Sequence, residues 1–334
     1  MKTTVVNINR LTLAAAMAEM GYLLVALVCI LCISTALSAA EIDWTKVETK
    51  TIKTFYPGVA SWDFMREQDH GTGAAPVKTM KKGCVDCHVG ENDAYDIKAD
   101  EIISGAHQMS KSKTPLEPEP IAGAKGFIEV KAQVAYDAEQ IHIRFQWAGS
   151  GASVADPALA ANEQIDRISV QFANKIQSFN NYGCYITCHN DQEGMPDDRG
   201  GKTKLYTYYS RGKDGLQAKD KLDGYKANGQ FIDLWEAGFV GKEVKAEDMY
   251  ILEDRIEDNN DLTATGSFEN GVYTVVISRK LASGDAGDIA LADGAAFTIG
   301  IAIHDNKNSG RKHYTSFPHA VGLGAAAEIN AQKF

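Results

Sequence analysis

The residues best suited to chemistry are two cysteines followed by a histidine, in Cys84-Val85-Asp86-Cys87-His88. This C-x-x-C-H pattern is the attachment signature of c-type haem. The two thiols add to the two vinyl groups at the porphyrin edge, and the adjacent histidine becomes the proximal ligand of the iron. The sequence therefore predicts a covalent haem on Cys84 and Cys87, with His88 on its iron.

A second pattern, C-x-x-x-C-H, is one residue longer and comprises Cys184, Cys188 and His189. The longer loop can still span the two vinyl groups, so it predicts a second covalent haem, again with the histidine as proximal ligand. The alternative is a disulfide within each pair, because an exported chain with four cysteines often forms two disulfides. Zinc fits less well, because each cluster offers only two cysteines and one histidine.

Each iron needs a second axial ligand if it only transfers electrons, and this ligand is usually histidine or methionine. His70 precedes the first motif across a glycine-rich loop that could fold over the porphyrin. His304 shares a strand face with Gly300 and Ala302, which leave room for a flat macrocycle, and His313 could cross over the same haem. His107 and Met109, downstream of the first motif, are alternatives to His70 for the first iron, whereas Met80 is too close to Cys84 to reach the distal side easily. His142 and His319 are expected to be bystanders, and the remaining methionines are Met65, Met195 and Met249.

The elements around these motifs change in character near residue 120. Residues 41–120 contain few strand signals and predict a small segment built around the first haem, which ends in a proline-rich connector at 111–120. Residues 121–334 then show apolar residues at every second position, which predicts an antiparallel β-sandwich. The expected strands are a hairpin over 127–147, then 167–172, 204–209, 271–278, 296–304 and 313–317, with two short helices at 234–238 and 246–254.

The N-terminal residues 1–40 predict a secretory signal. Basic Lys2 and Arg10 precede an apolar run from Tyr22 to Ile33, and Ser38 and Ala40 fit a cleavage site before Glu41. An uncleaved membrane anchor is the alternative, although the run is short for a span. Cys29 and Cys32 lie in this run, so the exported chain keeps four cysteines, and its location is expected to be the periplasm.

The composition excludes some classes of protein. The chain has 334 residues, of which 44% are apolar and 23% are charged, as in ordinary globular proteins. Its formal charge is −10, so it would repel a phosphate backbone and nucleic-acid binding is not expected. An acidic surface favours steering towards basic redox partners.

The order of these motifs resembles multihaem c-type cytochromes that carry the haem-binding domain of the ethylbenzene dehydrogenase γ-subunit family. The resemblance implies a β-sandwich with haem at one end and a role in periplasmic electron transfer. In the γ-subunits the haem is b-type and is bound through methionine and lysine, whereas this chain has its own Cys-His motifs, so no b-haem ligand is transferred to it. The residues that carry the resemblance are His70, 83–90, 119–121, 135–137, 145–147, 183–189, 233–235, 302–305 and 311–314.

These observations predict a periplasmic dihaem c-type cytochrome, an electron carrier rather than an enzyme, that transfers single electrons in anaerobic respiration. One alternative is an electron-transfer subunit of a molybdenum-containing oxidoreductase complex. Another is a haem enzyme or sensor in which one iron keeps an open site. The sequence gives neither the partner nor the oligomeric state.

Overall fold

The structure is a computed structural model of the chain. It describes residues 42–56, 82–89, 95–108, 113–117, 119–162, 165–173, 175–189, 205–212, 215–258, 261–305 and 313–334. The predicted signal and His70 lie outside these residues. The chain forms two compact units, Met1–Asp43 and Trp44–Phe334, and every helix and strand that the structure describes belongs to the second.

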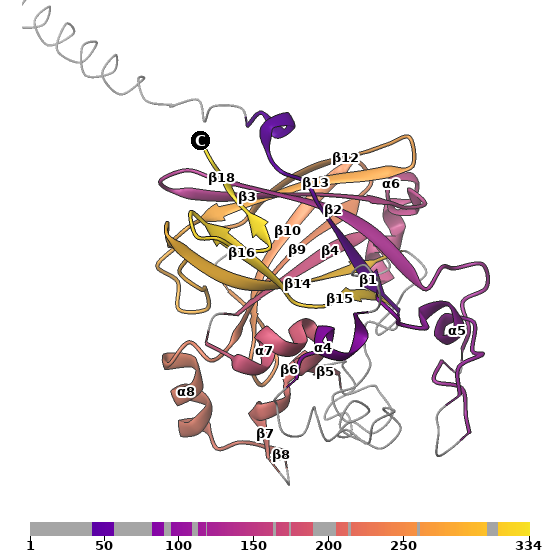
Figure 1. Cartoon of the computed structure of the whole chain (residues 1–334), viewed down its shortest axis with the longest axis horizontal. Helices are drawn as coiled ribbons and strands as arrows, with labels where there is room; N and C mark the ends of the chain where they lie inside the picture. Colours follow the sequence, from indigo (N-terminus) through magenta and orange to yellow (C-terminus); the bar gives the residue numbers. More distant parts are fainter. Residues whose placement is uncertain are drawn as a thin grey trace, which may run out of the picture. The chain divides into compact units, whose positions relative to one another are not determined.

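A large, mainly antiparallel sheet makes up most of the second unit, with the order β11-β10-β9-β4-β14-β15-β1-β2-β3-β13-β12 (Figure 1). Three short strands join it beside this path, because β16 pairs with β14, β17 with β16 and β18 with β2. The strands of this sheet are β1 Lys50–Phe55, β2 Phe127–Tyr136, β3 Gln140–Ala148, β4 Arg167–Ala173, β9 Ile232–Val240, β10 Glu243–Ile251, β11 Arg255–Glu257, β12 Thr263–Glu269, β13 Val272–Lys280, β14 Ala295–His304, β15 Tyr314–Ser316, β16 His319–Leu323, β17 Ile329–Asn330 and β18 Gln332–Lys333.

The predicted hairpin is confirmed as β2 and β3, which pair from Val130↔Trp147 to Tyr136↔Ile141. Residues at every second position of β3 are buried, as expected for a strand with one face towards a core. The same alternation continues on β13, where Phe145 lies opposite Val275. The period-2 pattern therefore places one hydrophobic face of each of these strands in the same core.

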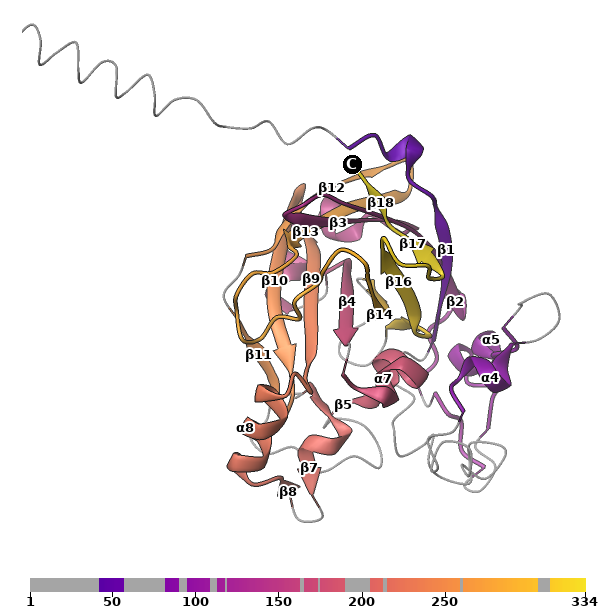
Figure 2. The same ribbon diagram turned by 60° about the vertical axis from the view of Figure 1, so that its left-hand side comes forward.

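The sheet curls until its two ends meet (Figure 2). The ring of Tyr273 on β13 lies 4.7 Å from that of Phe239 on β9, centre to centre. A side chain at Gly266 on β12 would come within 3.1 Å of Val244 on β10, so these two strands pack closely although they share no ladder in the sheet order. The fold is the expected mainly β class, with the hydrophobic core enclosed by one curled sheet.

The two short helices expected at 234–238 and 246–254 are wrong, because both stretches are strands. Residues 232–239 of β9 are buried on both faces, so apolar residues occur at consecutive positions and hide the strand period. On β10 the buried inward positions include an aspartate, Asp248, which conceals the alternation. In β9 and β10, burial in the folded protein determines the strand structure, and the local hydrophobic pattern does not reveal it.

The sheet also takes one strand from the predicted N-terminal haem segment. β1 pairs with β2 along its whole length and with β15 at Thr54↔Ser316. Ile52 and Phe55 are buried against the sheet. Residues 50–55 thus belong to the sheet.

Short elements cluster below one end of the sheet, where α4, α7, β5 and β6 lie (Figures 1 and 2). They hold both cysteine motifs. The short elements of the unit are η1 Trp44–Lys46, α4 Val85–His88, α5 Ala99–Ile103, α6 Ala152–Ala155, η3 Pro157–Asn162, α7 Gln177–Tyr182, η4 Gly183–Ile186, η5 Tyr208–Ser210 and α8 Lys219–Ala227, with the two-stranded pairs β5 Thr187–His189 with β6 Leu205–Thr207, and β7 Arg211–Gly212 with β8 Gly215–Leu216.

Candidate haem-binding site

The first motif forms a single helical turn. The backbone N–H groups of Cys87 and His88 both donate to the carbonyl of Cys84, at 3.2 and 2.9 Å. In a helix, residues three and four apart share one face, so this turn presents the two thiols and the imidazole on the same side. The Asp86 carboxylate accepts from the Gly83 N–H at 2.6 Å and holds the start of the turn. The spacing of C-x-x-C-H is thereby explained by one turn of helix.

The His88 imidazole is oriented by a carboxylate. Its Nδ1 lies 3.1 Å from an Asp96 oxygen, and the Asp96 N–H donates to the His88 carbonyl at 3.3 Å. A carboxylate on one ring nitrogen fixes the tautomer and leaves the other nitrogen, Nε2, to bind a metal. The donor set at this motif therefore fits an iron held by His88 Nε2.

The second motif is built differently, because it passes from a 3-10 turn into a strand. Cys184 lies in η4, and its carbonyl accepts from the Thr187 hydroxyl at 2.6 Å. The backbones of Cys188 and His189 lie in β5 and pair with Tyr206 and Leu205 of β6. The structure does not describe the side chains of Cys188 and His189. The extra residue of C-x-x-x-C-H thus occupies the change from turn to strand.

Two glycines allow this motif to pack on the sheet. Gly183 has a φ of +54°, and a side chain there would approach the Pro318 nitrogen at 3.1 Å. A Cβ on Gly300 of β14 would lie only 2.6 Å from the Cys184 Sγ. The predicted small-residue face of this strand therefore does lie against the second motif, with the Cys184 thiol directly over Gly300.

The two motifs touch although about 100 residues separate them. The Cys84 N–H donates to the Asn181 carbonyl at 3.1 Å, just before the second motif. The Tyr182 hydroxyl donates to the Lys82 carbonyl at 2.5 Å across the same junction. Tyr182 is buried, so this contact is a packed one. Residues 82–84, at the start of the first motif, are thus bonded to residues 181–182, just before the second motif.

An aromatic cluster lies between the motifs and consists of Phe55, Tyr95, Tyr185 and Phe317. Phe317 is central: its ring centre lies 5.1 Å from Tyr95, 5.6 Å from Phe55 and 6.0 Å from Tyr185. It also stacks on the His88 ring at 6.4 Å with an interplanar angle of 21°. Sequence reasoning missed this cluster, although the tyrosines on either side of Cys184 are the signal that could have pointed to it.

Among the described cysteines, Cys84, Cys87 and Cys184 form no disulfide. Burial raises the pKa of Cys84 and of Cys184 to about 12. Among the described residues, no cysteine–histidine group has metal-ligand spacing. The motifs fit haem attachment better than either alternative.

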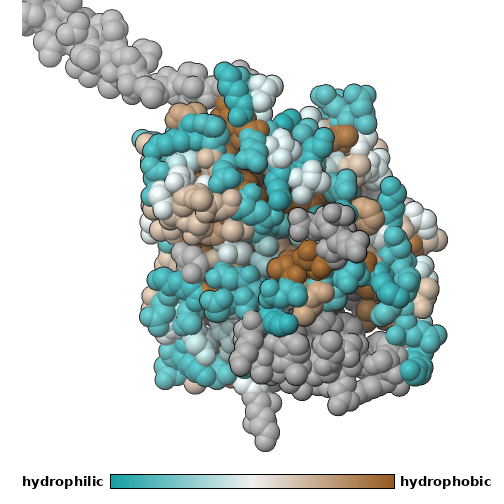
Figure 3. Space-filling model, viewed as in Figure 1, coloured by the Kyte–Doolittle hydropathy of each residue, from teal (hydrophilic) through white to brown (hydrophobic). Residues whose placement is uncertain are grey.

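The two motifs differ in exposure. Cys87 is exposed, and its neighbours Val85 and Val89 are 36% and 40% exposed. Figure 3 shows hydrophobic atoms on an otherwise mainly hydrophilic face, over the region where α4 lies in Figure 1. Gly183, Cys184, Tyr185 and Ile186 are instead all buried. The first motif thus meets the surface, whereas the described first half of the second motif, Gly183–Ile186, is buried.

The structure brings His304 and His313 together. Their rings stack with centres 4.5 Å apart and an interplanar angle of 17°, and both are buried. The Arg167 guanidinium lies 3.5 Å from the Nδ1 of His304. When two imidazoles bind one iron from opposite sides, each metal–nitrogen bond is about 2 Å long. The two ring centres then lie farther apart than the 4.5 Å between the rings of His304 and His313. In this arrangement at most one of the two can ligate a given iron.

Among the residues that the structure describes, no helix is long and apolar enough to cross a membrane. A curled β domain that carries C-x-x-C-H chemistry at one end is the architecture of an electron-transfer protein with covalent haem.

Comparison with known proteins supports this class of protein. The family model for ethylbenzene dehydrogenase matches residues 41–257 and 238–316, so the chain belongs to this family. It is 33% identical to cytochrome c-552 of Stutzerimonas stutzeri over 304 residues. This aligned region covers 89% of this chain and 93% of that protein. It is 26% identical to cytochrome c-551 of Rhodocyclus tenuis, over 87% of this chain and 99% of that protein. The chain is therefore a c-type cytochrome with covalently bound haem, and it transfers electrons.

Solved structures resemble it only distantly. A family 9 carbohydrate-binding module from Caldicellulosiruptor kristjanssonii, in complex with glucose, aligns with a TM-score of 0.29 and 8% identity, covering 59% of this chain and 69% of that one.

Proposed function

We propose that this chain is a periplasmic dihaem cytochrome that carries single electrons in anaerobic respiration, and that it is a carrier rather than an enzyme. One haem is attached to Cys84 and Cys87 and the other to Cys184 and Cys188. The observation that carries the proposal is the junction between the motifs, where the Cys84 N–H donates to Asn181 and Phe317 lies between His88 and Tyr185. Two haems placed here are neighbours, and an electron can pass between them.

The residues of each motif have separate tasks. The four thiols hold the porphyrins in place, and His88 and His189 are the proximal ligands. Asp96 orients His88, and Gly300 leaves space beside the Cys184 thiol. The haem itself supplies the one-electron iron couple.

The distal ligands follow from the same geometry. His70 is proposed for the first iron. For the second iron, the buried pair His304 and His313 supplies one ligand, and the other ring packs against it. Histidine on both sides of an iron gives a low potential, and methionine would raise it. Near-infrared magnetic circular dichroism of the oxidised protein and of a His304→Ala and a His313→Ala variant identifies which histidine binds.

The location and the partner also belong to this proposal. The apolar run before residue 40 is proposed to direct export to the periplasm, where haem is attached. The formal charge becomes −11 once Lys2, Arg10 and Glu19 are removed with residues 1–40. Such a protein is steered towards redox partners with basic surface patches.

The deciding experiment counts haems on the protein made with the cytochrome c maturation machinery. Intact mass and a pyridine haemochrome spectrum are measured for the unmodified chain, for Cys84→Ser/Cys87→Ser and for Cys184→Ser/Cys188→Ser. We expect two covalent haems in the first and one in each variant. A single haem in the unmodified chain, lost only with Cys84 and Cys87, would contradict the dihaem proposal.

One observation favours a second candidate function, namely an electron-transfer subunit of a molybdenum-containing oxidoreductase. The family model that matches most of the chain is that of ethylbenzene dehydrogenase. Size-exclusion chromatography of the protein from its native cells separates the two functions. A free carrier elutes near the mass of one or two chains, whereas a subunit elutes with a much larger catalytic partner.

A further inference from the structure

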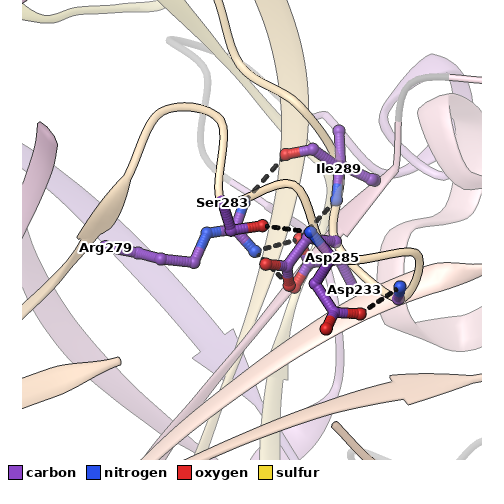
Figure 4. Close-up of polar contacts among 7 residues, drawn as sticks. Asp233, Arg279, Ser283, Asp285 and Ile289 are labelled. Atoms are coloured by element: carbon purple, nitrogen blue, oxygen red, sulfur yellow. Dashed lines mark hydrogen bonds and ion pairs between the residues drawn. The ribbon is translucent and has the colours of Figure 1, made fainter. Parts of the chain in front are cut away.

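Three aspartates from separate parts of the chain meet in the structure. Figure 4 shows one of them, Asp233, beside Arg279 and the loop that contains Ser283, Asp285 and Ile289. Asp233 lies on β9, Asp248 on the adjacent β10 and Asp288 on the loop between β13 and β14. Each offers a carboxylate oxygen, and the three oxygens lie within 4.8 Å of one another. We call these residues the acidic triad. The side chains of Asp233 and Asp288 are only 0% and 3% exposed, so water does not screen their repulsion.

One positive charge faces the triad. Arg279 of β13 has a side chain that is 1% exposed, and its Nη1 donates to Asp233 Oδ2 at 2.7 Å and contacts Asp288 Oδ1 at 2.6 Å. Its Nη2 donates to the Ile289 carbonyl at 2.8 Å, and its guanidinium lies 4.6 Å from the centre of the Trp235 ring. This single cation leaves two carboxylate charges of the triad without compensation, and buried charges need compensation.

Asp248 is the residue that points to a ligand. It is only 3% exposed, and neither of its buried oxygens accepts a hydrogen bond from an N–H group or a hydroxyl of the described residues. Asp233 Oδ1 likewise lacks a described partner. The side chain within hydrogen-bond reach of Asp248 is a further carboxylate, Asp261. Two facing carboxylates can be held together only by a shared proton or by a cation.

The loop that supplies Asp288 is held in shape by its own side chains. The Asp285 N–H donates to the Ser283 hydroxyl at 3.1 Å, and the Gly287 N–H donates to Asp285 at 2.9 Å. Asp233 also accepts from the Ile289 N–H at 2.9 Å, which fixes the loop to β9. The carboxylates therefore converge from two strands and a braced loop.

We propose that the acidic triad, with Asp261, binds one calcium ion. Its oxygens are the hard ligands that Ca²⁺ prefers, and they come from several irregularly placed carboxylates, which suits calcium better than the strict octahedron of Mg²⁺. The triad with Arg279 leaves two negative charges and Asp261 adds a third, so a divalent cation offsets most of this charge. The ion joins β9 and β10 to the loop after β13, so its role is structural, and the proposal is independent of the haem assignments.

The test is made on the haem-loaded full-length protein. Calcium content is measured by elemental analysis after gel filtration in metal-free buffer. Thermal unfolding is then followed by circular dichroism in EDTA and after addition of CaCl₂ or MgCl₂. We expect about one bound calcium per chain and a Tm that rises by about 5 °C or more with CaCl₂ and much less with MgCl₂.

The variants connect this effect to the triad. Asp248→Asn should abolish the Tm rise, and Asp288→Asn, on the loop, is the second variant in case the first folds poorly. Asp223→Asn changes an exposed aspartate of α8 and should respond like the unmodified protein. The proposal is overturned if the unmodified protein holds no calcium and its Tm ignores CaCl₂, because the triad is then neutralised by protons. A full calcium response in Asp248→Asn also overturns it.

Discussion

The two cysteine motifs have almost the same composition but very different surroundings. Cys84 to His88 form one helical turn whose Cys87 is exposed. Cys184 and its neighbours are buried in a 3-10 turn against β14, and the chain then enters a strand. The difference teaches that the two proposed haem positions are held by different means. Local helix geometry builds the first motif, whereas the second depends on the sheet beneath it.

The largest expected effect comes from Phe317, the residue whose ring contacts both motifs. Phe317→Ala should lower the free energy of unfolding by about 3–5 kcal/mol, because a buried ring is removed from the aromatic cluster. Since Phe317 contacts both His88 and Tyr185, the visible spectra of both haems should change. Denaturant unfolding followed by circular dichroism gives the stability. Phe334→Ala, at an exposed position, is the control and should change it by less than about 0.5 kcal/mol. A change confined to one haem would show that the motifs are not coupled through Phe317.

Gly300→Val tests the dependence of the second motif on the sheet. A Cβ at this position would lie 2.6 Å from Cys184 Sγ, so the branched side chain should cost about 1–3 kcal/mol and reduce attachment of the second haem only. Intact mass and thermal unfolding measure both effects. Gly224→Ala is the matched control, because Gly224 lies in α8 with no heavy atom within 4 Å of its Cβ position. It should stabilise the protein by up to about 1 kcal/mol. Equal loss of both haems in Gly300→Val would contradict the comparison.

An ion-pair cluster bridges β1 and β16. Glu328 lies 3.0 Å from Lys50 Nζ on β1 and 3.0 Å from His319 Nδ1 on β16, which pairs with β14. Sequence reasoning placed His319 among the bystanders. Burial raises the pKa of Glu328, but the hydrogen bonds from His319 and Lys50 outweigh this and lower it to about 2.

A carboxylate with a lowered pKa stabilises the fold above its ordinary pKa of 4.5, and this stability is lost as the pH falls towards about 2. Glu328→Gln should therefore cost about 1 kcal/mol at pH 7, since the group is partly exposed. Urea unfolding at several pH values should show this difference shrinking between pH 4.5 and 2. A difference that stays constant with pH would mean that the charge of Glu328 is not the cause.

The smallest effect should be confined to the first haem. Asp96→Asn replaces the carboxylate that lies beside His88 Nδ1 with a neutral amide. The imidazole of His88 then becomes a weaker electron donor to ferric iron. The reduction potential of the first haem should rise by about 30 mV, which is half of a tenfold change in a one-electron equilibrium. Spectroelectrochemical titration resolves the two potentials, and that of the second haem serves as the internal control. A shift shared equally by both would contradict the separation of the two sites.

The sequence predicted the fold class and the chemistry because both depend on local patterns. Alternation at 141–147 identified its strand, and C-x-x-C-H needs only one helical turn. The two short helices were wrong because β9 is buried on both faces and β10 carries Asp248 inward. The aromatic cluster was missed because Phe55, Tyr95, Tyr185 and Phe317 come from four distant segments. The small-residue face of β14 was interpreted as space for a macrocycle, and the structure places the Cys184 thiol against Gly300 on this face.

The pairing of β1 with β15 has a consequence for the order of folding. Thr54 lies opposite Ser316, so the middle of the sheet joins the two ends of the domain. Contacts between residues so distant in sequence are slow to form, because closing a long loop costs entropy before any contact repays it. A chain made from its N-terminus must wait for residue 316 before this ladder closes. The hydrogen bonds that close the helical turn at Cys84 lie within residues 83–88. The second motif lies on β14 and becomes complete only with the last strands.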